Sequence, residues 1–288
     1  ALAMGLCLIL AARAFAGGAA ENGGPAGSRG PGESGGADDA VVTLEVGYMP
    51  ILPVAQAMII DGLGWAEAEG IRLEMQRFSS GPAMVQATAA SNLDVMNFGI
   101  GPALVTRSRG QDIRVVASSI VEQIALIAGG ELAEVFDPTA PQELFTAFQA
   151  RYGRPARIAT FPAGSVPDTV LRYWLDVTLG IGSDGLEIIP MGSDQVQQVL
   201  LFGAVDGASI LEPILTIVQE RDPEARVLVR ADSMFPDQPG AVLAVRQELI
   251  AQRPDVVQTL VELHARATRY LQENPAEAAA IVAGYIGE

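Results

Sequence analysis

The chain has no lysine, a single cysteine (Cys7) and a single histidine (His264) among its 288 residues. One cysteine excludes an internal disulfide and a cysteine-based metal cluster, and one histidine excludes a multi-histidine metal site. The 18 basic residues are outnumbered by 34 acidic residues, which gives a net charge of −16. Nothing in such a chain would neutralise phosphates along a nucleic-acid backbone, so we expect no nucleic-acid partner.

The apolar content is high enough for a packed core. The chain is 49% hydrophobic and 18% charged, which is inconsistent with general disorder. Its length allows one large domain or two smaller ones.

The first forty residues differ in composition from the rest. Residues 1–12 are apolar, and Ala14-Phe15-Ala16 matches the small-x-small pattern of signal-peptidase sites. We therefore predict that residues 1–16 are part of an export signal and that the protein is extracytoplasmic or periplasmic. Residues 17–40 are rich in Gly, Ala, Ser and Pro, which predicts a flexible linker that would also suit a tether.

From residue 43 onward one unit repeats: an apolar strand, a Gly/Ser turn, a proline and a helix. Proline suits the first turn of a helix because its missing N–H is not needed there, and Ser and Gly are favoured as N-caps. The expected units are strand 44–47 with helix 54–69, strand 72–78 with helix 83–90, and strand 95–98 with helix 103–109.

If these strands are parallel neighbours, their helix N-termini meet at one edge of the sheet. Open α/β sheets bind ligands at that edge, and free N–H groups there favour negative charge. The pattern thus predicts a cradle for a small ligand. Ordinary strand-to-helix turns without a ligand remain the alternative, since every α/β protein has them.

A second region repeats the same unit of strand, turn, proline and helix. The predicted fold class is therefore α/β, with two lobes and a ligand cleft between them. Strands 113–117 and 124–128 are expected to close the first region. The predicted order is a first lobe at 41–128, a second lobe at 129–230, and a return to the first lobe at 231–288 that ends in helices 247–251, 255–273 and 276–285.

The order of these motifs resembles the substrate-binding proteins of bacterial ABC importers. The resemblance is strongest to those for sulfonates, taurine, nitrate and thiamine-precursor pyrimidines, and it covers roughly residues 43–286. It rests on the segments Val46-Gly47-Tyr48-Met49-Pro50, Gly62-Leu63-Gly64-Trp65, Phe78-Ser79-Ser80-Gly81-Pro82, Leu93-Asp94-Val95, Gly99-Ile100-Gly101-Pro102, Gly164-Ser165-Val166-Pro167, Gly207-Ala208-Ser209-Ile210 and Glu212-Pro213.

The resemblance implies the bilobal fold of type II periplasmic binding proteins and a binding function without catalysis. It implies capture of one small molecule, closure about a hinge, and delivery to a membrane permease with its ATPase, by a monomer without a cofactor or metal. The ligand contacts it implies are Tyr48, Met49, Ser79, Ser80, Gly81, Gly101 and Ser118 in the first lobe, and Ser165, Asp168 and Glu212 in the second.

Each of these residues also has a structural interpretation. The serines would be helix N-caps, Asp168 and Glu212 would be first-turn carboxylates, and Tyr48 would belong to the core. His264 is expected to be a partly exposed structural residue of the last long helix. The set contains no arginine, although a bound sulfonate or nitrate gains from a cationic partner, so pyrimidine-like and amine-bearing ligands stay open.

Two other functions are compatible with parts of this pattern. A ligand-sensing domain that reports to a membrane partner would use the same fold and the linker at 17–40. An enzyme resembling the pyrimidine synthases of thiamine biosynthesis would need histidine and cysteine near the turns, and the chain offers only His264 and Cys7. We therefore predict a binding protein and no enzymatic activity.

Overall fold

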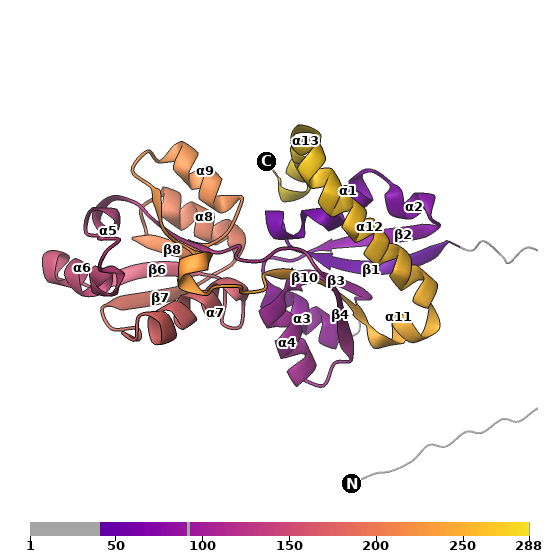
Figure 1. Cartoon of the computed structure of the whole chain (residues 1–288), viewed down its shortest axis with the longest axis horizontal. Coiled ribbons are helices and arrows are strands. Elements are labelled where there is room, and N and C mark those ends of the chain that lie inside the picture. Colours follow the sequence, from indigo (N-terminus) through magenta and orange to yellow (C-terminus); the bar gives the residue numbers. More distant parts are fainter. Residues whose placement is uncertain (1–40, 91–92, 288) are drawn as a thin grey trace, which may run out of the picture. The chain divides into compact units, whose positions relative to one another are not determined.

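The computed structural model describes residues 41–90 and 93–287, so the predicted signal and linker lie outside the described residues. Within them, two five-stranded sheets form the framework (Figure 1). The first sheet has the order β2-β1-β3-β10-β4, with β1 parallel to β2 and β3, and β10 antiparallel to β3 and β4. Its strands are β1 Val42–Tyr48, β2 Ile71–Arg77, β3 Val95–Gly99, β4 Ile113–Ser118 and β10 Ala241–Arg246.

The second sheet repeats this arrangement in the order β7-β6-β8-β5-β9. Its β6 is parallel to β7 and β8, and β5 is antiparallel to β8 and β9. The strands are β5 Ala125–Ala128, β6 Ala156–Thr160, β7 Leu186–Pro190, β8 Gly207–Ile210 and β9 Arg226–Arg230. The predicted fold class, two α/β lobes, is confirmed.

The sequence prediction placed strand 124–128 in the first region, and this placement is wrong. β5 pairs with β8 and β9 in the second sheet. All four of its residues are buried, as a strand between two partners requires, but an apolar run of this kind fits either sheet equally well. We therefore propose that the second lobe begins with β5.

Two segments, residues 119–124 and 231–240, cross between the sheets, and we call them the crossing segments. They lie against each other: Val121 forms an antiparallel bridge with Pro239, and the Glu122 N–H donates to the Gln238 carbonyl at 3.0 Å. Glu122 and Asp237 both have positive φ angles, +52° and +59°. The Asp237 N–H donates to Glu122 Oε1 at 2.8 Å, so the two left-handed residues are joined directly.

Helices α3 (Gly81–Ala89) and α7 (Val166–Tyr173) begin at the Ser-Gly/Val-Pro motifs that predicted them. Two other predictions were wrong in detail. α4 spans Ile100–Ser108, so Pro102 is its third residue rather than its first, a position where an N–H is still not required. The predicted helix 54–69 is divided into α1 (Ala55–Gly62) and α2 (Trp65–Ala68), because Gly64 between them adopts a φ of +65°.

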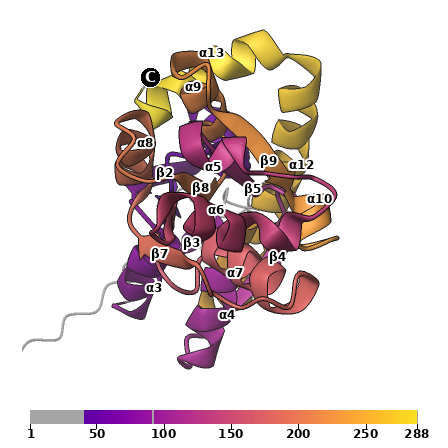
Figure 2. The same cartoon turned by 90° about the vertical axis from the view of Figure 1, so that its left-hand side faces the viewer.

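The last two helices, α12 (Pro254–Glu273) and α13 (Pro275–Ile286), return to the first sheet, where both contact α1. α12 turns one apolar face inward, with Val256, Leu260, Leu263 and His264 buried. Trp174 is buried in the second sheet's core, where its ring meets Phe145 edge to face. No helix among the described residues is both long and apolar enough to cross a membrane. The remaining α-helices are α5 Gly130–Glu134, α6 Leu144–Tyr152, α8 Ser193–Leu201, α9 Ile214–Arg221, α10 Ala231–Met234 and α11 Gln247–Gln252 (Figures 1 and 2). Short 3-10 turns lie at Leu52–Val54 and Pro141–Glu143, and a π-helical turn lies at Trp174–Thr178.

Candidate functional site

The turns that follow the parallel strands of the two sheets contact each other. The Ser193 N–H donates to the Ser79 carbonyl at 3.4 Å, and the Leu52 N–H donates to the Glu212 carbonyl at 3.2 Å. These bonds join turns of the first sheet to turns of the second. The contact region therefore contains the strand ends where the sequence predicted a ligand cradle.

On one side, where α3, α4 and α7 begin, the two sheets approach each other closely. A Cβ on Gly101 would lie 2.7 Å from the Gly164 carbonyl oxygen, and one on Gly99 would lie 2.5 Å from Val166 Cγ2. Within the first lobe, a Cβ on Gly81 would lie 2.4 Å from Pro102 Cγ. The structure brings the predicted Gly81, Gly101 and Ser165 together here, around a backbone contact. We call this the glycine side.

Two predicted serines on the glycine side cap helices. Ser80 Oγ accepts from the Ala83 N–H at 3.3 Å, and Ser165 Oγ accepts from the Asp168 N–H at 3.4 Å. Both serines are buried. Capping engages one lone pair of each oxygen, which leaves the hydroxyl hydrogen and the second lone pair for a ligand.

Asp168, which is 4% exposed, is also committed to local partners. Its Oδ1 accepts from Arg172 Nε at 2.9 Å, and its Oδ2 accepts from the Gly164 N–H at 3.4 Å. This arrangement is the first-turn carboxylate that the structural interpretation predicted, strengthened by an ion pair one helical turn away. A ligand role for Asp168 stays a prediction.

Tyr48 and Met49 are buried at the end of β1. The Tyr48 ring meets Tyr285 edge to face at 6.0 Å, and Tyr285 donates its hydroxyl to Asp61 at 2.5 Å. Burial raises the pKa of the Tyr48 hydroxyl above its ordinary value. Nearby Arg77 offsets part of this rise in pKa, and Asp61 adds to it. Tyr48 and Met49 therefore belong to the hydrophobic core.

His264 was expected to be partly exposed, and this prediction is wrong. Its side chain is 3% exposed, and its Nε2 lies 3.4 Å from the carbonyl oxygen of Ser118, one of the predicted ligand residues, and 3.5 Å from Ser119 Oγ. Its place on the buried face of α12 explains the difference, because the apolar spacing continues through it. His264 thus supports the start of a crossing segment, and burial lowers its pKa.

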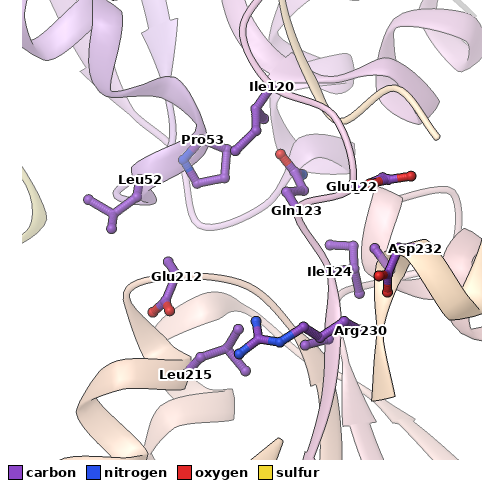
Figure 3. A pocket seen from close by; sticks show the side chains of 12 residues that line it. Leu52, Pro53, Ile120, Glu122, Gln123, Ile124, Glu212, Leu215, Arg230 and Asp232 are labelled. Atoms are coloured by element: carbon purple, nitrogen blue, oxygen red, sulfur yellow. The ribbon is translucent and has the colours of Figure 1, made fainter. Parts of the chain in front are cut away.

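The other side of the contact region contains a cavity of about 440 Å³, shown in Figure 3. It lies between the turn after β1, the crossing segments, and the turn after β8, and we call this the cavity side. Glu212 is the only predicted ligand residue in its lining. The lining is Leu52, Pro53, Ile120, Glu122, Gln123, Ile124, Ala125, Glu212, Leu215, Arg230, Ala231 and Asp232.

The charged groups of the cavity are largely unpaired. Glu122, Glu212 and Asp232 each accept one backbone N–H, from Asp237, Thr216 and Ser233 respectively, at 2.8 to 3.0 Å. None of the three carboxylates is joined to Arg230 by an ion pair in the described part of the chain.

Sequence reasoning missed Arg230, Glu122, Gln123 and Asp232, and its conclusion that the candidates lack an arginine does not hold for this cavity. The available signal was weak: Arg230 ends a strand, as a cleft residue of this fold should, but so do several other arginines. Glu122, Gln123 and Asp232 lie on the crossing segments, outside the units of strand, turn, proline and helix that predicted the ligand cradle. Among the residues the structure describes, no three or more His, Cys, Asp or Glu side chains are placed so that they could hold a metal ion.

Comparison with known proteins agrees with this architecture. A candidate binding protein of Brucella abortus is 26% identical over 225 residues, which are 77% of this chain and 65% of that protein, so the chain spans less than two thirds of its relative's length. The periplasmic nitrate-binding protein of Synechocystis PCC 6803 superposes with a TM-score of 0.69 at 19% identity, covering 84% of this chain and 66% of that one.

The alkanesulfonate-binding protein of Xanthomonas axonopodis pv. citri, bound to MOPS, gives a TM-score of 0.69 at 16% identity. The match covers 86% of this chain and 80% of that chain. At such identities the structural likeness establishes a periplasmic-binding-protein fold. Residues 37–287 match the NMT1-like family, and the chain belongs to that family.

Proposed function

We propose that this chain is the extracytoplasmic solute-binding protein of an ABC importer, which captures one small polar molecule and presents it to a membrane permease with its ATPase. The observation that carries the proposal is the cavity of about 440 Å³, which is lined by the turn after β1, both crossing segments, and residues of the second sheet and of the turn after β8. Its volume is in the range of small-molecule sites, and its lining combines apolar walls with a few polar groups, as such sites do. Relatives and structural neighbours that are named as binding proteins support the same function.

The arrangement of the lining suggests how binding would act on the molecule. A solute in the cavity would contact Leu52 and Pro53 on one side and Glu212 and Leu215 on the other. Contacts from both sheets are made together only when the two approach each other, so the ligand would stabilise that arrangement. The crossing segments are the part of the chain that would bend.

A thermal-shift screen of the full chain tests the proposal. The panel contains taurine, alkanesulfonates, nitrate, bicarbonate, hydroxymethylpyrimidine and simple amines. A ligand at about a hundred times its dissociation constant should stabilise the protein by about 2.7 kcal/mol. Binding without turnover of the hit would support a binding protein, whereas product formation would overturn it in favour of an enzyme.

Uptake of the same compound in cells that lack the protein separates transport from sensing. Loss of uptake supports delivery to a permease. Normal uptake with a lost cellular response to the compound would indicate the sensing function instead.

A further inference from the structure

The charges of the cavity specify its ligand more narrowly than the fold does. Its lining holds three carboxylates and one guanidinium, so it carries a surplus of negative charge. A site for a simple oxyanion would be expected to carry the opposite surplus. The lining therefore argues against nitrate or a plain alkanesulfonate as the ligand.

The carboxylates are held in place and still have acceptor capacity. Each of Glu122, Glu212 and Asp232 uses one oxygen to accept a backbone N–H, and the other oxygen makes no hydrogen bond within the described residues. The backbone bonds fix the orientation of each group without neutralising its charge. An ammonium or amidinium group would supply both the missing donors and the missing charge.

Arg230 provides the complementary group. Its guanidinium forms no ion pair among the residues described here, although carboxylates line the same cavity. In Figure 3 it points toward the side where Glu212 lies, while Glu122 and Asp232 are on the opposite side. A guanidinium presents paired N–H groups that match a carboxylate or sulfonate. Unpaired charges of both signs on one small cavity are best satisfied by one molecule that carries both.

We propose that the cavity binds a small zwitterion, a solute with an ammonium or amidinium group close to a carboxylate or sulfonate group. Arg230 binds the anionic group, and the carboxylates of the lining, among them Glu212 on the turn after β8, bind the cationic group. This inference rests on the proposed solute-binding function and adds the chemical class of the solute. Arg230 and Asp232 are exposed and Glu122 and Glu212 are half-buried, so a solute with only one of the two charges leaves the opposite charges of the lining to water, whereas a zwitterion pairs with both.

Two matched triads test the inference by calorimetry on the full chain. One consists of taurine, ethanesulfonate and ethylamine, and the other of β-alanine, propionate and propylamine. We expect each zwitterion to bind about tenfold or more tightly than either of its single-charge analogues, because each lost contact involves a charged hydrogen bond.

Variants assign the two charges to residues. Glu212→Gln should weaken taurine and β-alanine by about tenfold while leaving the weak binding of ethanesulfonate and propionate unchanged or improved. Arg230→Gln should weaken the zwitterions and the plain anions but not the amines. The matched controls Glu187→Gln and Arg269→Gln, at exposed positions outside the cavity, should change none of these affinities.

The outcomes separate this inference from the proposed function. Equal or tighter binding of ethanesulfonate, propionate or nitrate than of the zwitterions would overturn the inference and leave a solute-binding protein for anions. Zwitterion binding that is insensitive to both cavity variants would overturn the cavity as its site. Absence of binding by all six probes would overturn the inference, and a wider panel without any ligand would overturn the proposed function as well.

Discussion

The glycine side and the cavity side of the contact region lie between the same two sheets but are filled differently. On the glycine side, Gly99 and Gly101 let the backbone of α4 reach Gly164 and Val166 directly. On the cavity side, longer charged side chains line a hollow, with Glu212 on the turn after β8 and Arg230 at the end of β9. Both sides consist of turns after parallel strands, where ligands of open α/β sheets bind. The comparison shows that position at the strand ends does not by itself determine how closely the two sheets approach, because small residues there allow backbone contact and larger side chains line a cavity.

The largest effect that we predict would break the contact on the glycine side. In Gly101→Val the new Cβ would lie only 2.7 Å from the Gly164 carbonyl oxygen. Overpacking of this kind costs about 1–3 kcal/mol. We expect either a lower melting temperature or, if the sheets separate without unfolding, a larger radius of gyration in small-angle scattering.

Gly284→Ala is the control for this variant. Gly284 is also helical but has open space at its Cβ position, so alanine there should be neutral or slightly stabilising. A Gly101→Val protein with unchanged melting temperature and dimensions would show that the close approach is absent in solution.

A second prediction sharpens the difference between helix capping and ligand binding. Ser80→Ala and Ser165→Ala each remove an N-cap acceptor, so each should lower the free energy of unfolding by about 1 kcal/mol in urea titrations. The neighbouring Ser79 is exposed and forms no side-chain hydrogen bond in the described structure, so Ser79→Ala should leave stability unchanged. Equal stability of all three variants would contradict the capping function.

A third prediction concerns the crossing segments beside the cavity. Asp237 has a φ of +59°, which β-branched residues adopt only with strain. Asp237→Val should therefore lower stability by about 1 kcal/mol, whereas Asp237→Gly should be nearly neutral. Asp184→Val, at an exposed turn with negative φ, controls for loss of the charge. If Val and Gly at 237 behave alike, the left-handed conformation is not maintained.

The smallest expected effect is a dependence on pH. Burial lowers the pKa of His264 below its ordinary 6.5, although the hydrogen bond to the Ser118 carbonyl partly offsets this. The unfolded chain therefore binds a proton at a higher pH than the folded protein does. The stability contributed by the neutral ring is complete above about pH 6.5 and declines as the pH falls toward the folded-state pKa. Urea titrations at pH 7.5 and 5.5 should show this decline, and in His264→Asn it should be smaller; an equal decline in that variant would assign it to other groups.

The sequence by itself determined the fold class and most helix starts. Proline after a Ser or Gly cap has local consequences, so Ser80 and Ser165 marked their helices correctly. The run at 95–98 was likewise recognisable as the buried strand β3. The single Cys and the single His were likewise sufficient to exclude a disulfide, a cysteine cluster and a multi-histidine metal site.

Only the tertiary structure decided which sheet received β5, that His264 is buried, and that the hollow lies on the cavity side. These outcomes depend on contacts between residues far apart in the chain. Glu122 and Arg230 are separated by more than a hundred positions, and no local pattern of either one indicates that they line one cavity. Local sequence fixes backbone conformation and periodicity, whereas the position of a cavity depends on where the packing of distant segments leaves space.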